Sequence, residues 1–339
     1  MKSEVFKIAA VQAAPVFMDR EATVEKACAL IAEAAHGGAR LAVLPEALIP
    51  GYPDWVWNLP AGKIAMNQGL YGRLLEQSVT IPSRTTDRLC ATAKEAGIFV
   101  VVGINERNSA TSGGSLFNTL LYIDDGGNIL GHHQKLVPTL AERTIWAYGD
   151  PSTLQVYDTS LGILGGLTCW ENYMPLARYT LYTQGISLYV APTYDESTTW
   201  QASMRHIARE GRTYVIGCCM SCKKEDVLTG VPELAPYYEE VGEWVNSGNS
   251  LIVDPDGTVI AGPLYREEGI LYAEVSGKKL RDTKWNLDVA GHYARPDVFS
   301  LWVQRSPNPI IRWNERHNAE DEDTAPPEDD GQEVTRGTR

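Results

Sequence analysis

Three side chains of different chemical type each stand directly after a run of mostly apolar residues. They are the carboxylate of Glu46, the ammonium of Lys135 and the thiol of Cys169. In an open α/β sheet, ligands bind at the carboxyl ends of the strands, so these three groups could converge in one pocket although they are far apart in sequence. Each alone is more often a turn residue, a surface charge or a small buried side chain. Their equivalent positions together indicate a site.

An α/β fold with a mixed sheet would position these residues, because apolar runs of strand length alternate with amphipathic stretches of helix length. The predicted strands are Val5–Gln12, Leu41–Leu44, Ile98–Ile104, Thr119–Ile123, Ile163–Leu167, Ser187–Ala191 and Tyr214–Cys218. The predicted helices are Arg20–Ala35, Thr86–Ala96, Pro175–Thr183, Thr199–Arg209 and Lys278–Asp288. The turns Asp124–Gly127 and Asp254–Gly257 are expected to join strand pairs as hairpins, which makes the sheet mixed.

Composition excludes several classes of protein. The chain has 339 residues, 44% of them apolar, which is enough for a sizeable core and unlike a disordered or collagen-like chain. The net charge is −13 and the longest basic run is the pair Lys223 and Lys224, which argues against a nucleic-acid binder. No signal-peptide core and no apolar run of the ~18 residues needed to span a membrane is found, so we expect a cytoplasmic protein with reduced cysteines.

Three regions are expected along the chain. No linker interrupts residues 5–275, which we predict to be one catalytic domain. Residues 276–313 are predicted to be an extension, in which Gly291–Asp297 is extended. Residues 314–339 are rich in Asp and Glu, with nine acidic against three basic residues between 315 and 339. Because this last region has no apolar periodicity, we predict that it is disordered.

Several motifs resemble the nitrilase branch of the carbon-nitrogen hydrolase superfamily. They are Leu44–Glu46, His133–Thr139 with Glu142 and Arg143 and then Gly149 and Asp150, Gly165–Asn172, and Trp200–His206. The resemblance extends from about Lys7 to Asp297. It implies a four-layer αββα sandwich of two mixed β-sheets flanked by helices, a Glu-Lys-Cys catalytic triad, and neither cofactor nor metal. It also implies a homo-oligomer, a dimer or a larger assembly such as a spiral, with residues 276–313 in the subunit contacts.

The resemblance also implies a role for each residue: Cys169 as nucleophile, Glu46 as general base, and Lys135 as the cation that stabilises the tetrahedral intermediate. Glu142 matches a second glutamate that positions Lys135 and the substrate. A thiol of pKa ~8.5 needs such neighbours to attack at neutral pH. Attack on a nitrile carbon places negative charge on nitrogen, where Lys135 and the backbone N–H of Trp170 could stabilise it. Glu46 would then activate two water molecules in turn, releasing ammonia and then the acid.

The residue after the nucleophile separates the branches of the superfamily. The sequence Cys169-Trp170-Glu171 followed by Asn172 resembles the nitrilase branch, whereas amidase branches commonly have Tyr or another residue after the cysteine. Trp170 could equally be a core-packing aromatic. We take nitrile hydrolysis as the leading activity. The candidates for the substrate pocket, each of which could instead be a packing residue, are Trp170, Tyr52, Pro192, Thr193 and Tyr194.

Two departures from the family pattern stand near these motifs. Val245–Ser250 occupies the place where relatives often have an Arg-Gly-Gly-Ser-like stretch, which concerns loop geometry or assembly. Tyr148 stands where relatives often have Gly or Gln, so we expect it near the entrance of the pocket, where it could alter substrate choice.

Three other activities stay open. The same triad could hydrolyse a small amide, or it could act as a nitrile or cyanide hydratase if the tetrahedral intermediate expels the thiolate instead of ammonia. The chain could also be an inactive filament-forming scaffold, against which the intact Glu46, Lys135 and Cys169 argue. The expected partners are water and a small nitrile, with no nucleic acid and no membrane. The motifs do not distinguish an aliphatic, aromatic, arylacetonitrile, cyanoalanine or cyanide substrate.

Two clusters suggest competing chemistry. Cys218, Cys219 and Cys222 could form a redox dithiol or part of a metal site, but no amphipathic helix begins at them and no fourth ligand stands at zinc-finger spacing. His132 and His133 could form a ligand pair, but neighbouring residues of a strand point to opposite faces. We therefore expect structural roles for both clusters.

Overall fold

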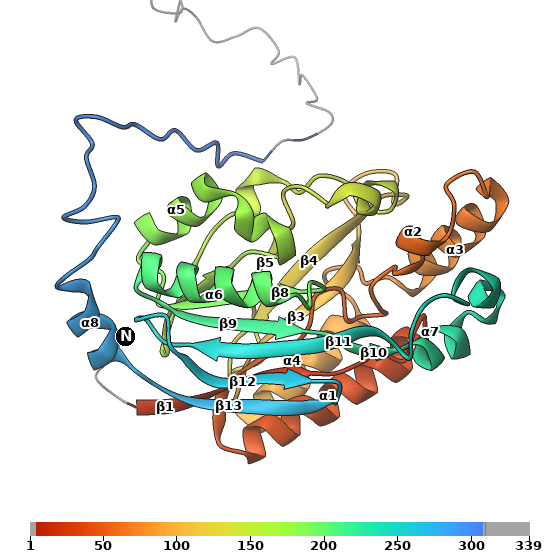
Figure 1. Ribbon diagram of the computed structural model, residues 1–339, viewed down its shortest axis with the longest axis horizontal. Helices are drawn as coiled ribbons and strands as arrows, with labels where there is room; N and C mark the ends of the chain where they lie inside the picture. Colours follow the sequence, from red (N-terminus) through yellow and green to blue (C-terminus); the bar gives the residue numbers. More distant parts are fainter. Residues whose placement is uncertain (1–4, 308, 310–339) are drawn as a thin grey trace, which may run out of the picture. The chain divides into compact units, whose positions relative to one another are not determined.

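The computed structural model describes residues 5–307 and 309, and it arranges residues 5–307 in four layers (Figure 1). Helices α1 (Arg20–His36) and α4 (Arg84–Ala96) form one outer layer, and α5 (Pro175–Thr183) and α6 (Thr198–Gly211) form the other. Two β-sheets lie between them. This confirms the αββα sandwich that the sequence predicted.

The first sheet has six strands in the order β13-β1-β2-β3-β4-β5. Their bounds are β1 Val5–Gln12, β2 Ala39–Val43, β3 Phe99–Arg107, β4 Leu116–Ile123, β5 Ile129–Gln134 and β13 Gly269–Ser276. Strands β1, β2 and β3 are parallel, while β4 and β5 follow as antiparallel neighbours. Strand β5 therefore runs in the same direction as β2, and both strands end at the same edge of the sheet.

The second sheet has seven strands, in the order β10-β11-β9-β8-β7-β6 with β12 paired to β11. Their bounds are β6 Tyr157–Thr159, β7 Gly162–Gly166, β8 Leu188–Thr193, β9 Tyr214–Cys219, β10 Ser221–Lys223, β11 Trp244–Val253 and β12 Val259–Tyr265. Strands β7, β8 and β9 are parallel, and the other pairs are antiparallel. Both sheets are therefore mixed, as the hairpin turns indicated.

Alternation along the strands separates the cores of the sandwich. In β8, Leu188 and Val190 contact the core between the sheets, whereas Tyr189 and Ala191 pack in the core beneath the outer helices. In β3, Val101 faces the inter-sheet core. Because successive side chains of a strand point to opposite faces, each strand contributes to two cores at once.

The remaining helices and 3₁₀ turns lie in the connections and after the last strand. They are α2 (Trp55–Asn58), α3 (Ile64–Gln77), α7 (Lys224–Gly230) and α8 (Gly277–Lys284), together with the 3₁₀ turns η1 (Leu140–Thr144), η2 (Pro151–Thr153), η3 (Cys169–Tyr173) and η4 (Pro232–Tyr237). The sequence did not predict α3. Its interior glycines, Gly69 and Gly72, weaken the helical signal, and Leu70 and Leu74 are its only fully buried residues.

Two predictions beyond residue 275 were wrong. The helix expected over Lys278–Asp288 ends at Lys284 in the structure. Gly291–Asp297 is not extended but forms turns, because the carbonyl of Asp288 accepts hydrogen bonds from the amides of Gly291 and Tyr293, both at 3.0 Å. Asp288 therefore begins a series of turns rather than ending a helix.

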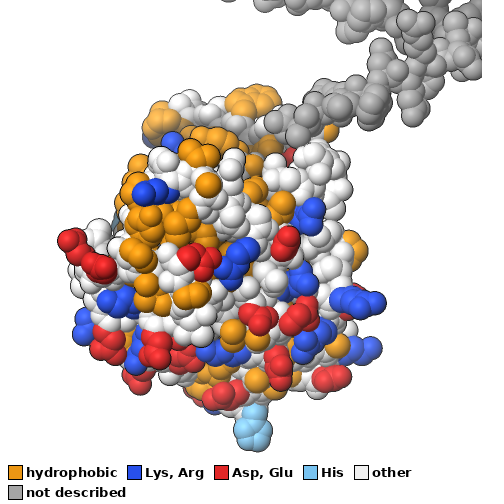
Figure 2. All heavy atoms as spheres, turned by 90° about the vertical axis from the view of Figure 1, so that its right-hand side faces the viewer, with side chains coloured by type: hydrophobic (Ala, Val, Ile, Leu, Met, Phe, Trp, Pro, Cys, Tyr) orange, Lys and Arg blue, Asp and Glu red, His pale blue; other side chains and the backbone are white. Residues whose placement is uncertain are grey.

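The surface toward α2, α3 and α7 carries charges of both signs. Figure 2 shows hydrophobic side chains gathered in the upper part of this face, and acidic and basic side chains interspersed over the lower part. In residues 5–307 and 309, no helix is both long and apolar enough to cross a membrane. The tail predicted to be disordered, residues 314–339, lies outside the described residues.

Candidate active site

Three strand ends bring the predicted triad together. Glu46 follows β2, Lys135 follows β5, and Cys169 follows β7. The Nζ atom of Lys135 lies 3.0 Å from Oε1 of Glu46 and 2.8 Å from Oε2 of Glu142. A carboxylate oxygen of Glu46, one of Glu142 and Sγ of Cys169 all lie within 4.8 Å of one another. All four side chains are buried.

The backbone at Cys169 has an unusual conformation. Its φ is 53°, in the left-handed region, where a residue other than glycine costs ~1–3 kcal/mol. The surrounding bonds impose this conformation: Nδ2 of Asn172 donates to the Cys169 carbonyl at 2.9 Å. Gly166 lets β7 approach β8, since a Cβ there would lie 1.9 Å from the carbonyl oxygen of Val190. The thiol is thereby directed toward Thr193, whose hydroxyl lies 3.3 Å from Sγ.

Glu46 is held through one oxygen and left open at the other. Its Oε1 accepts hydrogen bonds from Nδ2 of Asn118 at 2.6 Å and from Lys135. Its Oε2 is buried and has no hydrogen-bond partner among the described residues. Burial raises the pKa of Glu46, although the charge of Lys135 opposes this. The free oxygen can therefore accept a proton from a thiol or from water.

Glu142 fixes the ammonium of Lys135. Besides Lys135, Glu142 accepts a hydrogen bond from the backbone N–H of Thr139 at 2.6 Å and one from the hydroxyl of Tyr52 at 2.7 Å. Burial lowers the pKa of Lys135, but the negative charges of the carboxylates Glu46 and Glu142 outweigh it, so the pKa is raised overall. Lys135 is therefore a fixed positive charge that contacts both carboxylates.

Cys169 is a neutral thiol in the resting site. Burial and the charge of Glu46 raise the pKa of its thiol well above the ordinary value, despite the opposing charge of Lys135. A neutral buried thiol needs a base that removes its proton as it attacks. A carboxylate oxygen of Glu46 lies within 4.8 Å of Sγ, a distance that one bridging water can span. The arrangement supports attack by sulfur on an electrophilic carbon beside a fixed cation.

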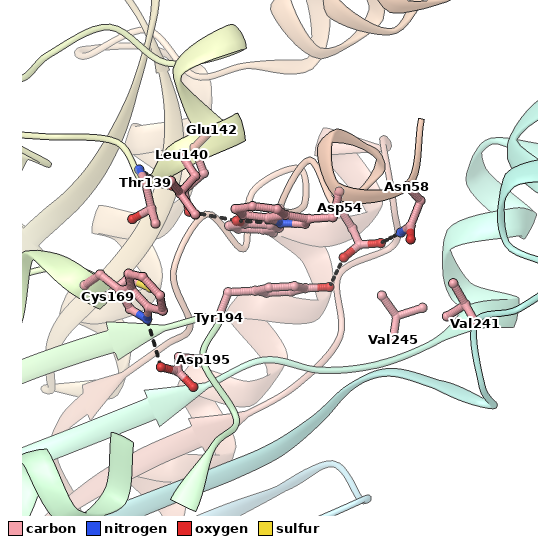
Figure 3. Close-up of a pocket in the computed structure, with 13 residues that line it drawn as sticks. Asp54, Asn58, Thr139, Leu140, Glu142, Cys169, Tyr194, Asp195, Val241 and Val245 are labelled. Carbon is pink, nitrogen blue, oxygen red and sulfur yellow. Dashed lines mark hydrogen bonds between the residues drawn. The ribbon is translucent and has the colours of Figure 1, made fainter. Parts of the chain in front are cut away.

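A cavity of about 430 Å³ opens onto the thiol. Figure 3 shows Cys169 at one end of this cavity and Val241 and Val245 at the other, with Tyr194 between them. The ring of Tyr194 stacks on that of Tyr52, with centroids 3.8 Å apart and planes 5° apart. The cavity is therefore mostly apolar and aromatic, with charged groups at its catalytic end.

The carbon-nitrogen hydrolase family model matches residues 7–284. The chain belongs to this family. An "Aliphatic nitrilase" of Sinorhizobium fredii is 42% identical over 308 residues, which cover 90% of this chain and 98% of that protein. A "Bifunctional nitrilase/nitrile hydratase" of Nicotiana tabacum is 41% identical over 303 residues, which cover 87% of this chain and 84% of the tobacco protein.

Solved structures of the superfamily share the fold. The crystal structure of Saccharomyces cerevisiae Nit3, a member of branch 10 of the nitrilase superfamily, superimposes with a TM-score of 0.67 at 20% identity, covering 86% of this chain and 97% of that one. An amidase from Nesterenkonia sp. gives a TM-score of 0.60 at 19% identity, covering 83% of this chain and 94% of the amidase. At these identities the likeness shows the architecture alone.

Trp170 lies at the cavity of this carbon-nitrogen hydrolase and not in its core. Its side chain is 46% exposed, and its Nε1 donates to Oδ2 of Asp195 at 2.8 Å. The alternative of a core-packing tryptophan was therefore wrong. Tyr52 and Tyr194 also line the cavity.

Two other pocket candidates lie elsewhere. Pro192 and Thr193 are buried in β8 and are not among the residues that line the cavity. Thr193 instead contacts Sγ of Cys169. Tyr148, expected near the entrance, is exposed and is not among the lining residues either. Pro192 and Thr193 are the last two residues of β8, whereas the residues of this segment that line the cavity, Tyr194 and Asp195, follow the strand.

The departure at Val245–Ser250 does shape the cavity of this hydrolase. Val245 lines it directly. Asn246 donates through Nδ2 to the carbonyl of Tyr194 at 2.6 Å, which fixes the backbone of that tyrosine. This segment therefore lines the cavity and supports another lining residue, besides setting loop geometry.

A buried carboxylate that the sequence did not single out lies at the far end of the cavity. Asp54 accepts hydrogen bonds from Tyr194 at 3.0 Å, from Tyr238 at 2.6 Å and from Asn58 at 3.2 Å. Burial raises the pKa of Asp54, although these three donors oppose it. The only signal for it was its place two residues after Tyr52.

The residues of the two competing clusters are largely buried and contact their neighbours in the fold. All six cysteines are free, and Cys218, Cys219 and Cys222 are buried. Cys218 donates to the carbonyl of Val11 at 3.0 Å. His133 is buried against Glu171 rather than paired with its neighbour on a metal. Among the described residues, the one cluster with metal-ligand geometry is the catalytic group itself.

Proposed function

We propose that this protein is a nitrilase, which hydrolyses a small organic nitrile to the carboxylic acid and ammonia. The observation that carries the proposal is the buried thiol of Cys169 between the free oxygen of Glu46 and the ammonium of Lys135, facing a largely apolar cavity. Relatives named as nitrilases, with about 40% identity over most of the chain, support the same conclusion.

In the first half-reaction, Sγ of Cys169 attacks the nitrile carbon. A carbon–sulfur bond forms, one carbon–nitrogen π bond breaks, and the thiol proton passes through Oε2 of Glu46 to the nitrogen, which gives a thioimidate. Lys135, held by Glu46 and Glu142, stabilises the negative charge that develops on nitrogen. The backbone N–H of Trp170 is the second donor that we assign to this position.

In the second half-reaction, the oxygen of a water molecule adds to the thioimidate carbon while Glu46 takes a proton from that water. As the carbon–nitrogen bond of the tetrahedral intermediate breaks, the nitrogen takes the proton held by Glu46 and the proton of the new hydroxyl group, so ammonia leaves and the thioester carbonyl forms. A second water, activated in the same way, attacks the resulting thioester. The carbon–sulfur bond breaks, the acid departs, and the proton returns to Cys169. The sum is one nitrile and two waters converted to one acid and one ammonia.

A nitrile hydratase side activity is the second candidate. The name of the tobacco relative includes both activities, which favours a hydratase side activity. The two products diverge at the tetrahedral intermediate, which releases ammonia if its carbon–nitrogen bond breaks and an amide if its carbon–sulfur bond breaks. We expect acid to be the major product, because the ammonium of Lys135 and the acid form of Glu46 both stabilise negative charge on the nitrogen that leaves as ammonia.

A panel of nitriles and the corresponding amides tests the proposal. Ammonia, acid and amide are measured for the wild type and for Cys169→Ser. We expect ammonia from at least one nitrile class, an excess of acid over amide, and no turnover by the variant. Turnover of amides but of no nitrile would identify an amidase instead. A folded wild type that turns over neither class would favour the scaffold alternative.

We propose in addition that the protein is a cytoplasmic homo-oligomer whose residues 276–313 take part in subunit contacts. Large apolar side chains of the described part of this extension support it: Trp285, Phe299 and Trp302 are 87%, 77% and 93% exposed. Exposed apolar side chains of this size commonly mark a contact surface. Sedimentation of the wild type and of Trp302→Ala tests the assembly, since an unchanged particle size would exclude Trp302 from a subunit contact. Fractionation of the source cells tests the location.

A further inference from the structure

One buried carboxylate connects the two loops that carry the nucleophile and the catalytic lysine. Glu171 accepts a hydrogen bond from the backbone N–H of Thr168 at 2.9 Å and another from that of Leu136 at 2.8 Å. Thr168 directly precedes Cys169, and Leu136 directly follows Lys135. The segments that follow β5 and β7, which are strands of different sheets, thus donate hydrogen bonds to the same side chain.

His133 completes this connection. Its Nε2 lies 2.9 Å from Oε2 of Glu171, and its Nδ1 lies 3.2 Å from the carbonyl oxygen of Thr153. A neutral imidazole has only one N–H, and here both ring nitrogens face acceptor oxygens. An imidazolium facing the carboxyl group of Glu171 satisfies both contacts, because it has an N–H on each ring nitrogen. The pair is buried, with side chains 2% and 0% exposed.

We infer that His133 and Glu171 form a positioning pair that holds the backbone of Cys169 against that of Lys135. Neither side chain is among the residues that line the cavity, so neither is expected to contact substrate. The pair should therefore determine the rate of the chemical step and leave substrate binding almost unchanged. The expected effects on the rate of the chemical step and on substrate binding rest on the proposed nitrilase function.

The charge state of His133 offers a readout that a purely structural pair would lack. Burial lowers the pKa of His133, but Glu171 raises it more, so the pKa lies above its ordinary value. The group that faces the ring from η2 is the uncharged carbonyl of Thr153. Tyr122 on β4 is a second titratable group near Glu171. Burial and the nearby charges of Tyr157 and Glu171 raise the pKa of Tyr122 well above its ordinary value.

The sign of the pH effect follows from these directions. The imidazolium is present below the ordinary pKa of histidine and is lost as the pH rises through the raised pKa of His133. The pKa values of Cys169 and Lys135 are raised well above their ordinary values. The first loss of kcat on the alkaline side should therefore come from His133.

Two substitutions of His133 separate its contacts. His133→Asn keeps a donor toward Thr153 and removes the contact with Glu171, whereas His133→Gln places an uncharged donor toward Glu171. We expect kcat of His133→Asn to fall by ~10- to 100-fold with KM changed less than about twofold, since a small misplacement of reacting groups costs this much. His133→Gln should recover part of kcat and lack the first alkaline loss.

A control variant removes an ion pair remote from the cavity. Asp256→Asn weakens the ion pairs that Asp256, at the turn between β11 and β12, forms with Arg212 at 2.9 Å and with Lys279. It should keep the wild-type kcat and the wild-type pH profile. All rates are measured below the onset of thermal unfolding of each variant, so that a loss of folded protein does not imitate a loss of rate.

A second readout needs no nitrile. The rate at which iodoacetamide alkylates Cys169, followed by peptide mass mapping, reports how well the site activates the thiol. We expect a decrease of about 10-fold in His133→Asn and a smaller one in His133→Gln. If the wild type turns over no nitrile, the proposed function fails while this measurement still tests the pair. The inference is overturned if both variants alkylate at the wild-type rate, or if they are folded with wild-type kcat and an unchanged alkaline profile.

Discussion

The two ends of the cavity are built differently. At the catalytic end, Glu46, Lys135 and Glu142 are buried and each is tied by charged hydrogen bonds of 2.6–3.0 Å. At the other end, Val241 and Val245 contribute side chains without polar atoms. Bonds between charged groups of both signs fix the first end, whereas the second combines these valines with one carboxylate, Asp54, that accepts hydrogen bonds from uncharged donors. Substitutions at the catalytic end should therefore change kcat and stability, and those at the far end should change the preference among substrates.

The largest combined loss of stability and turnover outside the nucleophile is expected for Lys135→Met. It leaves the carboxylates of Glu46 and Glu142 buried side by side without their cation, and breaking a buried pair in this way costs ~3–5 kcal/mol of unfolding free energy. Nitrile turnover should fall by ~10³-fold because the charge on nitrogen is no longer stabilised. Urea unfolding and ammonia release measure the two effects.

The matched control is Lys26→Met. Lys26 pairs with Glu268 at 2.7 Å, but both side chains are substantially exposed, so the loss should be within about 1 kcal/mol and without effect on turnover. Equal losses of stability for the two variants would contradict the difference that we draw between the catalytic end and the surface.

The pH dependence of kcat/KM sharpens the role of Glu46. A general base must be ionised, so activity is present above its pKa and is lost as the pH falls through it. Because burial raises the pKa of Glu46 above the ordinary 4.5, the acid limb should lie above 4.5. Glu46→Gln should lower kcat/KM by ~10²- to 10⁴-fold and remove this limb. An acid limb that persists in a residually active Glu46→Gln variant would assign the base elsewhere.

Substitution at the far end should give a smaller and selective effect. Val245→Phe narrows the cavity opposite Cys169, so KM for a bulky aromatic nitrile should rise by ~10-fold while a short aliphatic nitrile is almost unaffected. The short nitrile is the internal control. An equal loss of kcat for both substrates would show that the far end influences the chemistry, against the division proposed above.

No effect on turnover is expected from removal of the acidic tail. A chain truncated after Asn314 loses nine acidic and three basic residues, all of them outside the family match over residues 7–284. Its kcat and KM should equal those of the full chain in the same assay. A folded truncation without activity would refute this prediction and would give the tail a role in the site.

The same division explains what could be predicted from the sequence. Glu46, Lys135 and Cys169 could be singled out because each directly follows a strand, and parallel strand ends meet at one edge of a sheet. Strands β1, β7, β8 and β9 were also located to within two residues at each end, because their apolar runs are long. These features depend on local pattern alone.

The residues that were missed depend on contacts between distant segments. Asp54 receives its donors from Tyr194 and Tyr238, and Glu171 receives one of its donors from Leu136, 35 positions away. No local pattern distinguishes such a carboxylate from a solvated one. Pro192 and Thr193 are absent from the cavity lining because β8 continues through both of them to Thr193, two residues beyond its predicted end, although Thr193 does contact Sγ of Cys169.

The central claim is that Cys169 forms a covalent bond to the nitrile carbon, and intact-mass spectrometry of an acid-quenched reaction tests it most directly. The wild type is mixed with a nitrile that it turns over, quenched during turnover, and mapped by peptide. The account predicts an adduct on Cys169 with the mass of a thioimidate or of a thioester, and no adduct in Cys169→Ala. Nitrile turnover by Cys169→Ala, or an adduct carried by another residue during productive turnover, would contradict it.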